Sequence, residues 1–183
     1  ESLALMQGVQ YTPEFLAINP NHAVPVLEIC WGDGSVQHML ESVAMVEWLA
    51  DAYPDKQLAP AATMSRERAD YLQQLHFGGV WMDAMLWQIR MHQDLLPADE
   101  ADPRSVDRAM DKLRSEVEPQ LLQQLSTADY MCGPEFSAAD IVLGHNVLWA
   151  RVYGLCQGPP FDAYVSRLAA RAAFARAFED APR

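Results

Sequence analysis

The sequence predicts an α+β fold, with a small strand-containing N-terminal part followed by an all-helical part. Three observations support this prediction. Residues typical of strands gather in one stretch, 24–40. Helical periodicity starts at residue 42 and resumes from residue 65 to the end, and a stretch rich in Pro and Ala, 54–63, separates the two parts. Half of the 183 residues are hydrophobic, which is enough for a substantial core.

The composition narrows the classes of partner. The net charge of −12 repels nucleic acid and anionic membrane surfaces, although a local positive field can still hold a small anion. No apolar run approaches the ~20 residues of a membrane span, and no signal peptide is visible. Cys30, Cys132 and Cys156 are odd in number and lack CxxC spacing, which indicates a reducing, cytoplasmic location and no metal site.

The N-terminal part is expected to hold one hairpin. Residues 1–5 have the character of a strand tail, and 6–18 form a loop or a short helical turn that begins at Thr12-Pro13. Because the chain starts with Glu in the middle of an element, we expect a further N-terminal segment. Residues 24–31 and 35–40 are strand-like, and Gly32-Asp33-Gly34 between them is a strong hairpin signal.

The remainder of the chain is expected to be helical. A first helix covers 42–53 and is stopped by Pro54. Longer helices cover 65–95, 103–126 and 137–153, and 160–180 holds one or two more. We therefore divide the chain into an N-terminal domain, 1–56, a linker, 57–64, and an all-α C-terminal domain, 65–183.

Two features of the stretch 19–42 suit a small peptide-like anion. A proline at position 25 cannot donate to a strand ladder, so Pro25 either begins an edge strand in trans or forms a cis bond that exposes the backbone of Val24 to a ligand. Glu41-Ser42 lies at a helix start, where free N–H groups and the positive helix end favour a carboxylate. The alternative for Ser42 is plain N-capping without a ligand.

Other residues have mainly structural interpretations. Ser137 and Asp140 form a capping box for the helix 137–153. Gly78-Gly79 inside a helix indicates that another group approaches the backbone there, either in the core or a subunit interface, or in a ligand pocket. The five histidines have no metal-ligand spacing, and His145 is expected in a core or interface.

The chain resembles the cytosolic glutathione transferase family over essentially its whole length, through four motifs in the family's order. The stretches NPNHAVPVL (19–27), ESVAMVEWL (41–49), GPEFSAADI (133–141) and YVSRLAARAAF (164–174) are similar to the family's NPxGKVPxL, ES-x-A-I-x-x-Y-L, G-x-x-x-S-x-A-D-I and Y-x-x-R…R-P-A-F. The resemblance implies a thioredoxin-like N-terminal domain, a linker and a helical C-terminal domain.

The resemblance also implies a glutathione site. The backbone of Val24 pairs with the cysteinyl part, Glu41 takes the γ-glutamyl ammonium and Ser42 its carboxylate. The predicted glutathione-binding set is completed by three neighbours, namely Pro25, His22 and His38. The predicted pocket for an apolar electrophile comprises His76, Gly79, Met82 and Met85.

The sequence departs from the family pattern in three places. The family's first strand and helix, with the Tyr, Ser or Cys that stabilises the thiolate, have no counterpart, so no catalytic residue is assigned. His22-Ala23 replaces the usual Gly-Lys, which removes a cation. Ala172 replaces a proline.

The predicted function is that of a homodimeric glutathione S-transferase in detoxification, with glutathione as co-substrate and a small apolar electrophile as its partner. The alternatives are a glutathione-dependent isomerase or reductase, and a non-catalytic binding or interaction protein of the same fold.

Overall fold

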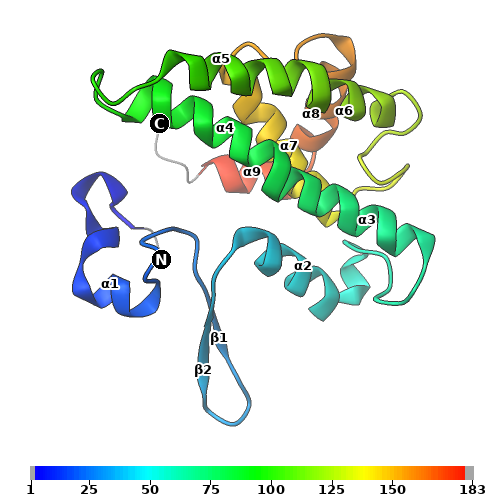
Figure 1. Ribbon diagram of the computed structural model, residues 1–183. Helices are drawn as coiled ribbons and strands as arrows, with labels where there is room; N and C mark the ends of the chain where they lie inside the picture. The colour runs from blue at the N-terminus through cyan, green and yellow to red at the C-terminus, as the bar shows by residue number, and fades with distance from the viewer. Residues whose placement is uncertain (1–2, 180–183) are drawn as a thin grey trace.

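The computed structural model describes residues 3–179 and confirms the α+β organisation. The N-terminal part contains α1 (Pro13–Ile18), a hairpin of β1 (Leu27–Cys30) and β2 (Val36–Met39), and α2 (Ser42–Ala52). Figure 1 shows the hairpin projecting away from the helical part, while α2 lies beside the long helix that contains α3. The turn of the hairpin therefore points away from the helices, and the strand ends that connect to α1 and α2 lie toward them.

The hairpin follows the prediction from its turn. Its strands pair antiparallel, with Leu27 opposite Met39 and Cys30 opposite Val36. In the turn, Asp33 Oδ1 accepts hydrogen bonds from the N–H and the hydroxyl of Ser35, at 2.9 and 2.6 Å. Gly34 has a φ of 85°, which L side chains rarely adopt.

The first residues differ from the expected strand tail at 1–5. Residues 1 and 2 lie outside the described range, and the next residues form no strand. Two short 3₁₀ helices, η1 (Leu5–Gln7) and η2 (Val9–Tyr11), precede α1 instead. The helical turn predicted at Thr12-Pro13 is confirmed, because the Thr12 hydroxyl accepts a hydrogen bond from the Phe15 N–H at 3.3 Å.

The helical part contains the predicted long helices. A short 3₁₀ helix, η3 (Pro54–Lys56), leads into it. Helix 65–95 is continuous and consists of α3 (Arg66–His76), π-helical η4 (Phe77–Met82), α4 (Asp83–Arg90) and π-helical η5 (Met91–Leu95). Helix 103–126 consists of α5 (Pro103–Lys112), π-helical η6 (Leu113–Val117) and α6 (Glu118–Leu125). The last three helices are α7 (Ala138–Val152), α8 (Pro159–Ala169) and α9 (Ala172–Glu179).

The main core lies within the helical part, where α4, α5, η6, α6, α7 and α8 meet. Its largest fully buried members include Met82, Leu86, Ile89, Leu113, Leu121, Leu143, Phe161 and Tyr164. A smaller cluster joins α2 to the helical part through Ala50, Tyr71, Leu75, Ala138 and Ala139. The N-terminal part is thus packed against α3 and α7 by its own apolar contacts.

The paired glycines of η4 are explained by close helix packing. A Cβ at Gly79 would overlap Cγ2 of Val43, the second residue of α2, and a Cβ at Gly78 would lie 3.0 Å from side-chain atoms of Val142 and Leu143. The expected close approach is therefore confirmed, and α2 fits into a notch that only glycine provides.

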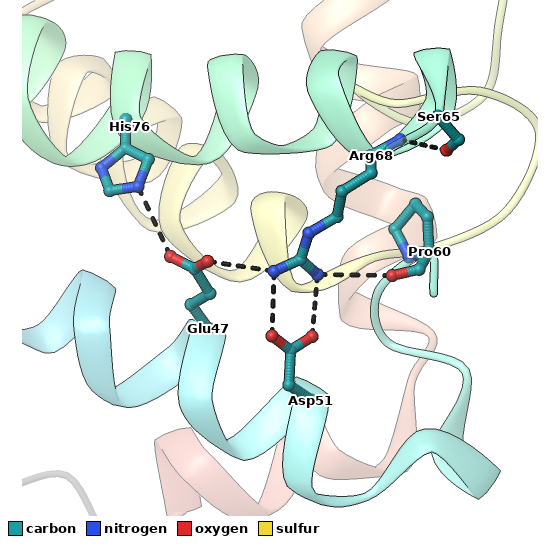
Figure 2. Close-up of polar contacts among 6 residues, drawn as sticks. All are labelled: Glu47, Asp51, Pro60, Ser65, Arg68 and His76. Atoms are coloured by element: carbon teal, nitrogen blue, oxygen red, sulfur yellow. Dashed lines mark hydrogen bonds and ion pairs between the residues drawn. The ribbon is translucent and has the colours of Figure 1, made fainter. Parts of the chain in front are cut away.

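One arginine joins α2, the linker and α3 (Figure 2). Arg68 donates to both carboxylate oxygens of Asp51 at 2.7 and 2.9 Å, to Glu47 at 3.0 Å and to the Pro60 carbonyl at 3.3 Å. Arg68 itself is only 8% exposed, while the Glu47 and Asp51 side chains that it binds keep 27% and 33% of their surface exposed. Glu47 also contacts His76 Nε2 at 3.4 Å.

The capping box at the start of α7 is confirmed. Asp140 Oδ2 accepts a hydrogen bond from the Ser137 N–H at 2.9 Å. Its other oxygen accepts from the Met131 N–H at 2.9 Å and from the Tyr164 hydroxyl at 3.0 Å. Burial nevertheless raises the pKa of Asp140, and the hydrogen bonds act in the opposite direction.

Among residues 3–179, no helix has both the length and the apolar character needed to cross a bilayer.

Candidate functional site

A cavity of about 520 Å³ lies between the N-terminal part and the helices. One wall comes from the loop before β1 and from the start of α2. The opposite wall comes from η4, α4 and α7. The cavity therefore gathers residues from three separate stretches of the sequence, 19–46, 79–87 and 141–149.

The loop wall is shaped by Asn19, which is 2% exposed. Its Nδ2 donates to the Ala23 carbonyl at 2.7 Å, and its Oδ1 accepts from the Asn21 N–H at 3.0 Å. The Val24–Pro25 bond is cis, which confirms the cis interpretation. Within the described part of the chain, the N–H and C=O of Val24 have no hydrogen-bond partner, so this peptide edge is free to pair with a ligand.

The α2 wall corrects the expectation that Ser42 caps the helix. Ser42 is the first helical residue, and Glu41 holds the N-cap position with a φ of 70°. No side chain accepts a hydrogen bond from the first N–H groups of α2 at this cap. The free N–H groups and the positive end of the helix dipole thus face the cavity beside the Ser42 hydroxyl.

The helical wall carries polar and aromatic groups in alternation. Asp83 and Trp87 lie one turn apart on α4, and His145 and Trp149 lie one turn apart on α7. The Trp87 and Trp149 rings meet edge to face with centroids 5.6 Å apart. Burial raises the pKa of Asp83, and the nearby charge of His145 partly opposes this shift.

Asn146 also lines this wall of the cavity. It is 1% exposed, and its Nδ2 donates to the Gly78 carbonyl at 2.9 Å. Gly78 belongs to the π-helical turn η4, where the regular i to i−4 ladder is interrupted. The amide thus holds α7 against the irregular turn that lines the cavity.

Five residues of the predicted site line this cavity: Val24, Pro25, Glu41, Ser42 and Gly79. The predicted pocket residues His76, Met82 and Met85 do not. Met82 has no exposed surface and lies in the main core, against which Met85 packs, while His76 pairs with Glu47. The helix face explains the correction, because residues at spacings of four from Gly79, not those around Met82, point to the cavity.

The two added histidines also lie elsewhere. His38 contacts Glu28 Oε2 at 3.2 Å across the hairpin. The His22 ring lies 5.0 Å from the Tyr11 ring, centroid to centroid. His145, expected in a core or interface, is an exposed side chain that lines the cavity.

Several cavity residues were missed by the sequence interpretation, namely Asn19, Asn21, Asp83, Asn146 and Trp149. The spacing of four that links Gly79, Asp83 and Trp87 was a readable signal. The α7 residues had none, because only the packing of α7 on η4 turns them to this side. In the part of the chain that the structure describes, no group of three His, Cys, Asp or Glu side chains is arranged to hold a metal ion.

Comparison with known proteins finds a matching family model and a relative that are both described as glutathione S-transferases. Residues 2–57 match the family model described as glutathione S-transferase, N-terminal domain. The chain is 27% identical over 141 residues to glutathione S-transferase GstA of Escherichia coli O157:H7, an alignment that covers 75% of this chain and 62% of the relative. This chain thus spans less than two thirds of that relative's length.

The solved structures agree with this match. A sphingomonad glutathione S-transferase in complex with glutathione is 26% identical, with a TM-score of 0.76 over 94% of this chain and 82% of that one. A glutathione transferase from Burkholderia graminis, with two glutathione molecules bound per subunit, is 23% identical. Its TM-score is 0.80 over 98% of this chain and 76% of that one, a likeness that shows the fold alone.

Proposed function

Because this chain belongs to the glutathione S-transferase family, we propose that it binds glutathione in the cavity between α2 and α7 and acts as a glutathione transferase. One observation carries the proposal. The unpaired peptide edge of Val24 and the uncapped start of α2 line the same cavity.

The cysteinyl and γ-glutamyl parts of glutathione have matching groups on this wall. The peptide of its cysteinyl residue pairs with the N–H and C=O of Val24, as in a two-stranded ladder. Its γ-glutamyl carboxylate accepts hydrogen bonds from the Ser42 hydroxyl and the first N–H groups of α2. Its ammonium group binds the Glu41 carboxylate. The positive φ of Glu41 supports this role, because strained backbone is concentrated at functional sites.

The proposed reaction is attack by the glutathione thiolate on a small apolar electrophile. The thiolate is the nucleophile, so the bound thiol must lose its proton before the new carbon–sulfur bond forms. Among the described lining residues, Ser42 alone carries a hydroxyl and none carries a thiol. Since Ser42 serves the carboxylate, the proposal assigns no residue to thiol activation.

The test is glutathione binding by calorimetry and retention on immobilised glutathione. A hydrogen bond to a charged group contributes about 1.5–3 kcal/mol, so Ser42→Ala should weaken binding about tenfold or more. Ser115→Ala, an exposed serine that bonds only within its own helix, is the matched control and should bind as the wild type does. If wild-type protein and Ser42→Ala both flow through the column, the proposed site is wrong.

A non-catalytic glutathione-binding protein is the second candidate. It is favoured by the absence of any Lys or Arg among the described residues that line the cavity. Binding without conjugation of any electrophile would support it. A steady release of product from a chlorinated nitrobenzene, or isomerase or reductase turnover, would support an enzyme.

We also propose a cytoplasmic homodimer with a role in detoxification. The exposed apolar surface around η4 suits a subunit interface, with Val80 64% and Trp81 42% exposed. Light scattering at micromolar concentration should give the mass of two chains. A single-chain mass would contradict the dimer and leave the glutathione site untouched.

A further inference from the structure

We propose that the electrophile of this site is a flat aromatic compound that carries a protonated amine, with Asp83 as the residue that selects the amine. This inference rests on the proposed glutathione transferase function and names the class of its second substrate. The residues concerned lie on the wall of the cavity formed by α4 and α7, opposite Ser42.

Asp83 is placed to accept a ligand cation. It lines the cavity and is partly buried. Among the described residues, no hydrogen-bond donor or ion-pair partner lies within contact distance of its carboxylate, and His145 acts on it only through its more distant charge. A partly buried carboxylate without a partner is costly, and a cationic ligand supplies the missing partner. Burial raises the pKa of Asp83, and a bound ammonium would lower it again by favouring the ionised form.

The charge of the cavity points the same way. Its described lining includes the carboxylates of Glu41 and Asp83 and the imidazole of His145, but no Lys or Arg. Glu41 is assigned to the ammonium of glutathione, which leaves Asp83 for the second substrate. An anionic electrophile would meet two carboxylates and no lining Lys or Arg, within a chain of net charge −12.

The aromatic residues define the rest of the substrate. The Trp87 and Trp149 rings form one edge-to-face wall, and the His145 ring lies 6.1 Å from Trp149. Arg90, which does not line the cavity, lies 5.8 Å from the Trp87 centroid and 6.0 Å from that of Trp149. Because Arg90 already supplies a cation to these two rings, they suit the aromatic ring of the substrate rather than its ammonium group. The ammonium group then reaches Asp83, which lies one helical turn from Trp87.

The step on such a substrate balances without another reactant. For a 4-chloro-3-nitrobenzamide, the glutathione sulfur forms a bond to the ring carbon that carries chlorine. The carbon–chlorine bond breaks, chloride leaves with the bonding pair, and the thiol proton passes to the solvent. The amine keeps its charge throughout and serves only to hold and orient the ring.

The experiment compares two matched electrophiles, N-(2-aminoethyl)-4-chloro-3-nitrobenzamide and its neutral N-acetyl derivative. The ratio of their kcat/KM values should favour the cation by about threefold to fivefold in the wild type, the size expected of one partly screened ion pair. Asp83→Asn should bring the ratio near one, and Asp83→Glu should keep part of it. Asp107→Asn, which removes an exposed charge outside the lining residues, should leave the ratio unchanged.

A binding measurement with compounds that lack the leaving chlorine tests the amine site without turnover. Quenching of tryptophan fluorescence by N-(2-aminoethyl)-3-nitrobenzamide and by its N-acetyl derivative should show the same preference and the same loss in Asp83→Asn. Equal binding of the two compounds, or a preference that survives Asp83→Asn, would overturn the inference while glutathione binding stands. An Asp83-dependent preference in a protein that fails to bind glutathione would support the amine site and overturn the proposed function instead.

Discussion

Single residues at the cavity hold backbone in positions that the chain would not adopt alone. Asn19 ties the loop before Val24 through both ends of its amide. Glu41 has a φ of 70°, in a region that residues other than Gly rarely occupy. Such a residue costs about 1–3 kcal/mol and persists where the surrounding structure or a function requires it. Position 41 therefore combines a stability cost with the proposed contact to glutathione.

Replacing this residue separates the two effects. Glu41→Gly should leave the free energy of unfolding unchanged or raise it slightly, because Gly adopts a positive φ without strain. It should weaken glutathione binding, because the carboxylate is lost. Urea unfolding and calorimetry measure the two effects. Gln57→Gly is the matched control, since Gln57 has a φ of 53° outside the cavity and should affect only stability. A clear loss of stability in Glu41→Gly would contradict the strain argument.

Helix α2 is the element that connects the fold to the proposed site. Its start lines the cavity, its second residue fits against Gly79, and its last turns bind Arg68 through Glu47 and Asp51. These contacts lie on one face of the helix, toward α3 and η4. The position of Ser42 is thus set by packing on the helical part as well as by the hairpin.

The notch for α2 can be tested by filling it. Gly79→Ala should destabilise the protein by about 1–3 kcal/mol, because the new Cβ overlaps Val43. The double variant Gly79→Ala, Val43→Ala should recover part of this loss in urea unfolding, because it restores the room. Gly32→Ala, at a position with no atom within 4 Å of the added Cβ, is the control and should change stability little. Full tolerance of Gly79→Ala would mean that α2 does not sit in this notch.

The arginine at the junction is predicted to be the strongest polar contact of α2. Arg68→Met removes the hydrogen-bond partner of two partly exposed carboxylates and should cost about 1.5–3 kcal/mol, the size expected of a hydrogen bond to a charged group. Adding Asp51→Asn should recover part of the loss, since one unpaired charge disappears. Arg66→Met, at an exposed arginine two residues before Arg68 in the same helix, should have little effect on the urea midpoint. Equal effects of the two single variants would contradict the junction.

For the molecule as a whole, stability comes from two apolar clusters that also bury titratable groups. Burial raises the pKa of Cys132 to about 11, that of Cys156 to about 12 and that of Tyr71 to about 12. Cys156 belongs to the main core and Tyr71 to the smaller cluster that joins α2 to the helices. The division of the chain into domains 1–56 and 65–183 with a linker 57–64 stays a prediction, and the smaller cluster packs residues of both domains together.

The pH dependence of stability follows from these shifts. In the unfolded chain these groups ionise near their ordinary values, 9.0 for Cys and 10.0 for Tyr. Between those values and the raised ones, the folded state holds more protons, so the free energy of unfolding falls as pH rises. Urea midpoints under reducing conditions should therefore drop from pH 8 to pH 10.5. Cys156→Ala should flatten the slope, and a stability that rises over this range would contradict the assignment.

The sequence alone determined the hairpin, the long helices and the polar stretch at residues 19–42, because hairpin turns, caps and helical periodicity are local signals. It predicted Val24, Pro25, Glu41 and Ser42 as glutathione-binding residues, and the structure places them on one wall of the cavity, with Ser42 in the first turn of α2 rather than at its cap. The opposite wall depended on tertiary structure. Which faces of α4 and α7 meet α2 is decided by the Gly79 notch and by Arg68, whose partners lie 17 and 21 residues away. That packing buries Met82 and turns Asp83, Trp87 and His145 toward the cavity.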